Sequence, residues 1–364
     1  MRFNLLLGVL TMLLVLTSQP ADAARPPLQA WDGPTTGPAA HPGKKLVIYI
    51  AQDYRNGGIT GVYRAFTGAA TSKLGWQVRA VDGKGEQQMV RVVFAQAIAS
   101  KPDAIVLGGI PPSDLPDLIA QAQQLGIKLV GWHAGAKAGP SKELFFNVTT
   151  DALAVAQMAA NYAIQNANGP MGAVIITDRR FDIAIAKSDA MKQIIEQCPN
   201  CRCLTVENVL ISNAAEEVGG LVQRLHKSYG KAWTHTFAIN DVYFDEMNFP
   251  LRQIKRPDIR NISAGDGSSK AINRIRGGLS QQVATIAEPL NAQGWQLADE
   301  LNRAFSGLPP SGYVTSPVLV TREMLNVIGP RDIDSHLEYR QAYERIWFPA
   351  RTTAQPANQM IFDN

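Results

Sequence analysis

The stretch Lys44–Asp82 constrains the fold of this 364-residue chain more than any other. It begins with the apolar run Leu46–Ile50, which is typical of a strand covered on both faces. A polar turn with two glycines follows, and then an apolar face recurs at helical spacing from Thr60 to Lys73. Gly75 ends that helix, and Gln77–Val81 is the next predicted strand. Open α/β sheets hold ligands beyond the carboxyl ends of their strands, so the polar turn is a candidate ligand loop.

The first 23 residues are expected to be a signal peptide rather than part of the fold. Arg2 supplies the positive charge, Leu5–Leu16 is apolar, and Ala21-Asp22-Ala23 fits a small-x-small cleavage site. The apolar run is shorter than the roughly 20 residues of a membrane span, so a retained anchor is the weaker alternative. We therefore expect a soluble mature chain in the periplasm.

Composition adds two expectations about the mature chain. Residues 24–43 are rich in Pro, Gly, Thr and Ala without periodicity, which predicts a flexible leader. The formal net charge of +4 is spread along the chain and forms no basic stripe, so no nucleic-acid partner is expected.

Strands and helices alternate from Lys44 to about Val320, and the pattern restarts once. The restart is the alanine-rich helix predicted over Asp151–Asn166, followed by the apolar strand Gly172–Thr177. Such alternation predicts parallel sheets flanked by helices, here as two α/β lobes with a cleft between them. Later helices are expected near 185–197, 214–227, 268–276 and 293–306, and later strands near 203–207, 236–240, 261–265, 282–287 and 313–320. Residues 333–347 are expected to form a surface helix, and 351–364 a loose tail.

Three stretches carry a resemblance to a known family: LVIYIAQDYRNGG from Leu46, FAINDVYFDEM from Phe237, and AGDGSSKAINRIRGGLSQQVATIAEPLNAQG from Ala264. Together they resemble the periplasmic sugar-binding proteins of ABC importers, in the ribose- and galactose-binding cluster related to the LacI repressor core. The resemblance implies the type I fold, with two Rossmann-like lobes, a three-segment hinge and a ligand cleft between the lobes. It assigns 44–149 plus 289–316 to the N-terminal lobe, 150–288 plus 317–328 to the C-terminal lobe, and 329–364 to an extension.

The same resemblance implies a set of pocket residues by position. A polyol presents hydroxyls that both donate and accept, so its pocket needs converging amide, carboxylate and cationic side chains. The implied ligand-binding residues are Tyr54, Asn56, His133, Asp151, Lys187, Asn240, Asp266 and Glu288. Aromatic rings that could stack on a sugar are Tyr54, Trp132, Phe181 and Tyr243.

Each of these residues also has a structural alternative. Asp151 is equally suited to cap a helix, Asp266 to form a turn, and Trp132 to fill the core. Lys187 is also suited to an exposed helix face, and His133 to an ordinary loop. His133-Ala134 replaces an Asp-Arg pair that many sugar binders carry, which favours a ligand other than a common pyranose.

The cysteines Cys198, Cys201 and Cys203 are closely spaced and invite a metal or redox interpretation. A structural zinc site needs four ligands, and no second pair of ligands accompanies these three. In an oxidising compartment we expect a disulfide between Cys198 and either Cys201 or Cys203, with one thiol left over.

Three functional classes follow. The first is a monomeric solute-binding protein that delivers a small polar ligand, a sugar or polyol, to an ABC permease at the inner membrane. The second is a periplasmic sensor of the same fold that signals to a receptor or sensor kinase. A secreted NAD-dependent enzyme is the weakest, because Gly57-Gly58-x-x-Gly61 lacks the G-x-G-x-x-G spacing. We therefore expect a binding protein without cofactor or metal, with hinges near Thr149–Thr150, Ala287–Pro289 and Ser316–Pro317.

Overall fold

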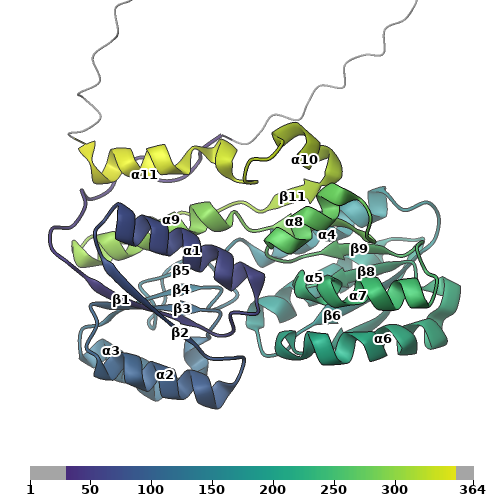
Figure 1. Ribbon diagram of the computed structural model, residues 1–364, viewed down its shortest axis with the longest axis horizontal. Helices are drawn as coiled ribbons and strands as arrows, with labels where there is room; N and C mark the ends of the chain where they lie inside the picture. Colours follow the sequence, from purple (N-terminus) through teal and green to yellow (C-terminus); the bar gives the residue numbers. More distant parts are fainter. Residues whose placement is uncertain (1–29, 350–364) are drawn as a thin grey trace, which may run out of the picture.

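A computed structural model describes residues 30–349 of the chain. It has two lobes, each with one sheet between layers of helices, so the predicted fold class is confirmed (Figure 1). The signal peptide over residues 1–23 and the tail 351–364 lie outside the described residues. None of the helices within 30–349 is both long and apolar enough to cross a membrane.

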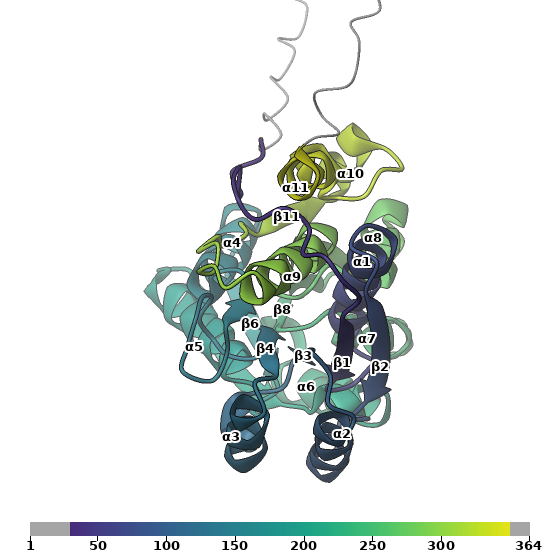
Figure 2. The same ribbon diagram turned by 90° about the vertical axis from the view of Figure 1, so that its left-hand side faces the viewer.

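The N-terminal lobe contains a parallel sheet of five strands in the order β2-β1-β3-β4-β5. Its strands are β1 (Leu46–Ala51), β2 (Gln77–Asp82), β3 (Ala104–Gly108), β4 (Lys128–Trp132) and β5 (Phe146–Val148). One face is covered by α1 (Gly57–Ser72) and α9 (Leu290–Phe305), and the other by α2 (Gln87–Ala99) and α3 (Pro116–Gln124) (Figure 2). The buried, nearly continuous apolar strands explain why both faces needed a helix layer.

The C-terminal lobe contains six strands in the order β11-β10-β9-β8-β6-β7. They are β6 (Met171–Thr177), β7 (Cys201–Asn208), β8 (His235–Ala238), β9 (Arg260–Ser263), β10 (Gln282–Ala287) and β11 (Val318–Thr321). Its helices are α4 (Ala152–Gln165), α5 (Asp182–Gln197), α6 (Ala214–Tyr229), α7 (Val242–Gln253), α8 (Ser269–Gly277) and α10 (Arg322–Ile328). The last strand departs from the expected parallel sheets, because β11 pairs antiparallel with β10. The chain leaves the sheet at the carboxyl end of β10, passes through α9 in the other lobe and re-enters beside that carboxyl end. Strand β11 therefore runs antiparallel to β10.

Between β1 and α10, three crossing segments connect the lobes: residues 149–151, 288–289 and 306–317. The first joins β5 to α4, the second joins β10 to α9, and the third joins α9 to β11. Helix α4 packs in the core of the C-terminal lobe, whereas α9 packs in the core of the N-terminal lobe.

The leader differs from the sequence-based expectation, whereas the C-terminal extension agrees with it in part. The described part of the leader, residues 30–43, is held against α9, where Asn302 donates to the carbonyls of Pro38 and Ala39. Helix α11 (Tyr339–Trp347) is a surface helix as expected, but its apolar face is packed closely, with Tyr343 and Trp347 buried against α9 and the leader. All residues of α9 from 292 to 304 are therefore buried, which an amphipathic pattern does not predict.

The disulfide links Cys198 to Cys201, at the turn between α5 and β7, and leaves Cys203 as a half-buried thiol. One of the two predicted pairings is thus confirmed. The short loop that it closes belongs to the outer edge of the C-terminal lobe, where β7 is the last strand.

Glu300 carries a carboxyl group on the outer face of α9, beneath the third crossing segment. It is fully buried, and its carboxyl accepts hydrogen bonds from the backbone N–H and the hydroxyl of Ser311. Burial raises the pKa of Glu300 to about 7, although the bonds from Ser311 act in the opposite direction. The folded protein therefore holds a proton here that the unfolded chain releases at lower pH.

We predict that the stability of the wild-type protein falls relative to Glu300→Gln as pH rises from about 4.5 to 7. Below this window Glu300 is protonated in both the folded and the unfolded state. The free energies of unfolding of the two proteins should then differ by an amount that does not depend on pH. Across the window the relative loss should be on the order of 3 kcal/mol, from the size of the pKa shift. Urea unfolding of both proteins at several pH values measures the difference. Parallel pH profiles would contradict the prediction.

Candidate functional site

The carboxyl ends of the two sheets face each other across the junction of the lobes. In the N-terminal lobe, Asn56 follows β1 and His133 follows β4; in the C-terminal lobe, Asn240, Asp266 and Glu288 follow β8, β9 and β10. Parallel strands bring their carboxyl ends to one edge, so side chains far apart in the sequence meet there. Each of these five side chains is at most 8% exposed.

A small pocket lies between the lobes at this edge, with a volume of about 30 Å³. That is room for roughly two water molecules, so in this geometry the lobes have closed on each other. A neighbouring hollow of about 230 Å³ shares Gly109 and Phe181 with the pocket and leads toward the surface. The pocket is lined by Asn56, Gly109, Trp132, His133, Phe181, Ile183, Ala184, Lys187, Ile211, Ile239, Asn240 and Asp266.

Glu288 brings charged groups of both lobes together beside this pocket. Its Oε1 lies 3.1 Å from Nε2 of His133 and 3.5 Å from Nζ of Lys187, and it accepts a 2.8 Å hydrogen bond from Thr150. Burial by itself would raise the pKa of Glu288, but the neighbouring His133 and Lys187 and the bond from Thr150 outweigh it and hold the pKa well below its usual range. Glu288 is therefore an ionised carboxylate in a dry site.

His133 lines the pocket in a strained backbone conformation and contacts Glu288. Its backbone has a φ of 49°, in the left-handed region, and its ring stacks on Trp132 with the centroids 3.9 Å apart. Although Nε2 is close to Glu288, the two atoms are not aligned for a hydrogen bond, and Nε2 has no other partner within the described residues. Backbone strain of this kind beside a buried ion pair is typical of a functional site.

Asn240 and Asp266 form a second polar group on the opposite wall. Nδ2 of Asn240 donates a 2.7 Å hydrogen bond to Oδ2 of Asp266. The loop that carries Asp266 is fixed by Asp241, whose Oδ2 accepts from the backbone N–H groups of Gly267 and Ser268. Burial raises the pKa of Asp266 to about 6, against the nearby charges of His133 and Lys187, which lower it.

The N-terminus of α1 touches the C-terminal lobe, and glycine is required at the contact. A Cβ atom at Gly58 would lie 2.3 Å from Oδ2 of Asp266, and one at Gly57 would lie 2.7 Å from Cβ of Ser268. Contacts below 3.0 Å are not tolerated, so the two glycines allow the lobes to come this close. They serve the approach of the lobes rather than a phosphate-binding turn.

Two similar turns close the mouth of the cleft. Arg55 pairs with the buried carboxylate of Asp53 in the loop after β1, and Arg180 pairs with buried Asp178 in the loop after β6. Each arginine also crosses to the other lobe. Nη1 of Arg55 donates to the carbonyl of Ser212, and Nη1 of Arg180 donates to that of Gly85, both at 3.0 Å.

Some residues implied by the resemblance lie outside the pocket. Asp151 is exposed, and its carboxylate caps α4 by accepting from the N–H of Ala154, so Thr150 rather than Asp151 reaches Glu288. Tyr54 packs on Tyr63 in the N-terminal lobe and does not line the pocket. Tyr243 lies in the core of the C-terminal lobe and donates to the carbonyl of Val209.

Other pocket residues were missed from the sequence. Ile183, Ala184, Ile211 and Ile239 are apolar and carry no chemical signal. The four residues Asp53, Arg55, Asp178 and Arg180 did carry one, since an Asp-x-Arg triplet follows the first strand of each lobe. Comparing corresponding loops of the two lobes would have found it.

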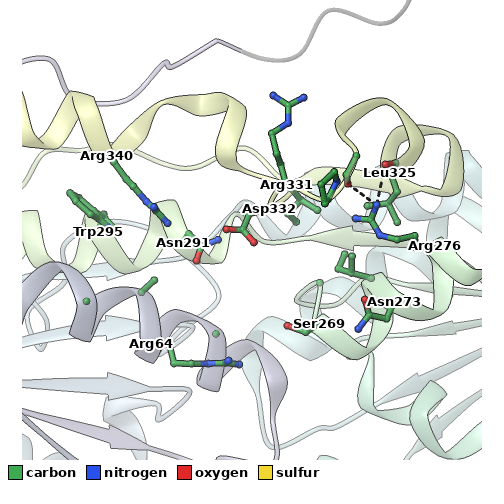
Figure 3. A pocket seen from close by; sticks show the side chains of 18 of the residues that line it. Arg64, Ser269, Asn273, Arg276, Asn291, Trp295, Leu325, Arg331, Asp332 and Arg340 are labelled. Carbon is green, nitrogen blue, oxygen red and sulfur yellow. Dashed lines mark hydrogen bonds between the residues drawn. The ribbon is translucent and has the colours of Figure 1, made fainter.

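A larger groove of about 1210 Å³ lies outside the interlobe pocket and shares none of its lining residues (Figure 3). Its walls come from α1, α8, α9, α10 and α11 and from the segment between α10 and α11. Arg64, Asn273 and Arg340 line it, while Arg276 is held by the carbonyls of Leu325 and Gly329. A solute site is expected where buried polar groups converge, which favours the interlobe pocket over this open groove.

Comparisons with known proteins agree with this geometry. The family "Periplasmic binding protein domain" matches residues 48–309. Among solved structures, an ABC transporter solute binding protein from Agrobacterium vitis with bound allitol is 18% identical, with a TM-score of 0.66 over 78% of this chain and 98% of that one. A search of curated proteins found no match.

Two further structures share the fold. A solute binding protein from Mycobacterium smegmatis with bound glycerol is 18% identical, with a TM-score of 0.68 over 80% of this chain and 99% of that one. One from Bacillus halodurans C-125 with bound myo-inositol is 15% identical, with a TM-score of 0.67 over 83% and 100%. The family and these neighbours are solute-binding proteins, in line with a binding protein rather than an enzyme. The family match covers most of the chain, and the chain therefore belongs to the periplasmic binding protein domain family.

Proposed function

We propose that this protein captures a sugar or polyol in the pocket between its lobes and delivers it to an ABC importer. The observation that carries the proposal is the convergence of buried polar side chains from both lobes on one pocket. His133, Lys187 and Asn240 offer donors, and Asp266 and Glu288 offer acceptors, which suits hydroxyl groups that need both. Allitol, glycerol and myo-inositol, bound by proteins of this fold, belong to the same chemical class.

Import is favoured over sensing because the similar solved structures carry the names of transporter proteins. The ligand enters when the lobes are apart and is enclosed when they close. Because it contacts both lobes, it binds the closed form better, and this difference in affinity shifts the population toward closure. Calorimetry of the purified protein with allitol, myo-inositol, glycerol and a panel of sugars tests the proposal. Failure of every sugar and polyol to bind would reject it.

Asn240→Ala should weaken binding of the polyol or sugar that the screen identifies. It removes a buried donor and leaves Asp266 without its partner, at a cost of about 1–3 kcal/mol, or roughly ten- to a hundredfold in affinity. Asn273→Ala, in the large groove, is the matched control and should leave affinity unchanged. If Asn273→Ala were the variant that lost binding, the groove would be the solute site. Titration calorimetry measures both.

Ligand affinity should also depend on pH through Asp266. The pKa of this carboxyl is raised to about 6, and a hydroxyl that donates to it favours the ionised form. Affinity should therefore rise several-fold between pH 5 and pH 7. His133 also lines the pocket, so the decisive comparison is with Asp266→Asn, in which this part of the pH dependence should disappear. An equally steep profile in Asp266→Asn would contradict the role of Asp266.

Lobe closure can be blocked by one methyl group. Gly58→Ala places a Cβ against the Asp266 carboxylate only when the lobes are closed, so it should weaken binding at least tenfold. The same change favours the helical conformation of α1, so thermal stability should stay equal or increase. Gly68→Ala lies in the same helix with open space around its Cβ and should bind normally. Small-angle scattering should show compaction on ligand addition for Gly68→Ala and less for Gly58→Ala.

A further inference from the structure

Gln293 lies in the first turn of α9 and is completely buried. Its amide oxygen accepts a 2.7 Å hydrogen bond from Nε1 of Trp132. Its amide nitrogen donates to Oε2 of Glu288 at 2.7 Å and to the hydroxyl of Thr315 at 2.8 Å. These three bonds fix the orientation of the amide. If the amide were turned over, its nitrogen would face the N–H of Trp132 and its oxygen would face the carboxylate of Glu288.

The partners of this amide–carboxylate pair come from all three crossing segments. Glu288 lies in the second segment and Thr315 in the third. Thr150, in the first segment, donates its hydroxyl to Oε1 of Glu288. One buried cluster therefore ties together the three crossing segments.

The same cluster reaches the ligand pocket. Trp132, bonded to Gln293, stacks on His133, and Nε2 of His133 lies 3.1 Å from Oε1 of Glu288. Gln293, Glu288, His133 and Trp132 thus form a closed ring of contacts. Within it, Oε1 of Glu288 contacts His133, Lys187 and Thr150, and Oε2 accepts from Gln293.

We propose that Gln293 is a positioning residue that orients the Glu288 carboxylate for the ligand and couples it to the hinge. The inference rests on the proposed function, because it concerns how the same pocket is held. A carboxylate buried in a dry site needs a partner on each oxygen, and Gln293 is the hydrogen-bond donor to Oε2. Without that donor the carboxylate turns, and the geometry of Oε1 toward the pocket is lost together with the tie between the crossing segments.

Gln296 provides a matched comparison on the same helix. It is also a buried glutamine, but its amide nitrogen donates to the carbonyl of Tyr313 and touches neither Glu288 nor Thr150. Loss of either side chain removes similar packing. Only the loss of Gln293 removes the link between Glu288 in the second crossing segment and Thr315 in the third, and with it the donor that orients the carboxylate toward Thr150.

The first experiment is hydrogen exchange of the ligand-free full-length protein, comparing Gln293→Leu with Gln296→Leu. Gln293→Leu should speed the exchange of backbone amides in and beside all three crossing segments by about tenfold or more. Gln296→Leu should do so only beside the third segment, where Tyr313 lies. Equal effects of the two variants on residues 149–155 and 288–293 would overturn the proposal.

The second experiment exchanges the two side chains. Gln293→Glu alone sets two carboxylates against each other and should loosen the crossing segments as Gln293→Leu does. Adding Glu288→Gln restores an amide–carboxylate pair with its direction reversed, and exchange should return toward that of the wild-type protein. Failure of this rescue contradicts a role through Glu288. Should Gln293→Leu not fold, Gln293→Glu and the exchanged pair give the same comparison.

The third experiment measures ligand affinity. The probe is allitol or myo-inositol, whichever the wild-type protein binds. Gln293→Leu should lower affinity about ten- to a hundredfold, and in a Glu288→Gln background the same change should have a much smaller effect. If Gln293→Leu lowered affinity by the same factor in both backgrounds, Gln293 would not act through Glu288 and the positioning role would be rejected. If neither probe nor any other polyol or sugar binds the wild-type protein, the proposed function fails, whereas the exchange measurements still decide whether Gln293 couples the segments.

Discussion

The buried carboxylate of Glu288 is the interaction on which the arrangement of the two lobes depends. It is excluded from solvent, and an ion in such a place is stable only when it is paired and hydrogen-bonded. Its partners are His133 from one lobe, Lys187 from the other and Thr150 and Gln293 beside the crossing segments. The charge of Glu288 is therefore fully paired only when both lobes and the crossing segments are in the positions seen here. Glu288 thus contributes to the site and also restricts how the lobes close.

Helix α9 supports this arrangement from the other side. It begins at the second crossing segment, carries Gln293 in its first turn and ends at the third crossing segment. The leader and α11 cover its outer face, where Trp347 and Arg303 both bond to the buried carboxylate of Asp299. Most of this cover lies outside residues 48–309, which match the family. The leader and α11 therefore stabilise the position of α9, the helix that lies between the second and third crossing segments.

Closure of the lobes is limited by sterics and strengthened by charge. Gly57 and Gly58 let the N-terminus of α1 reach the loop that carries Asp266, where any side chain would collide. At the mouth, Arg55 and Arg180 are each fixed by a buried aspartate of their own lobe before they reach across. A guanidinium oriented in this way loses less conformational entropy when it binds the opposite carbonyl. Each lobe has an Asp-x-Arg triplet after its first strand, and each arginine donates to a backbone carbonyl of the other lobe. The two contacts across the cleft are therefore equivalent.

The sequence by itself determined the alternation of strands and helices, the two lobes and a choice of two disulfide pairings, because periodicity and spacing are local properties. The resemblance of three stretches to sugar-binding proteins, carried over by position, indicated Asn56, His133, Lys187, Asn240 and Asp266. Tertiary structure decided what local pattern cannot express. Thr150 reaches Glu288 while the adjacent Asp151 caps a helix, and the leader and α11 bury a face of α9 that would otherwise meet solvent. Which of two neighbouring polar residues points inward, and which helix face is covered, depends on packing between segments distant in the chain.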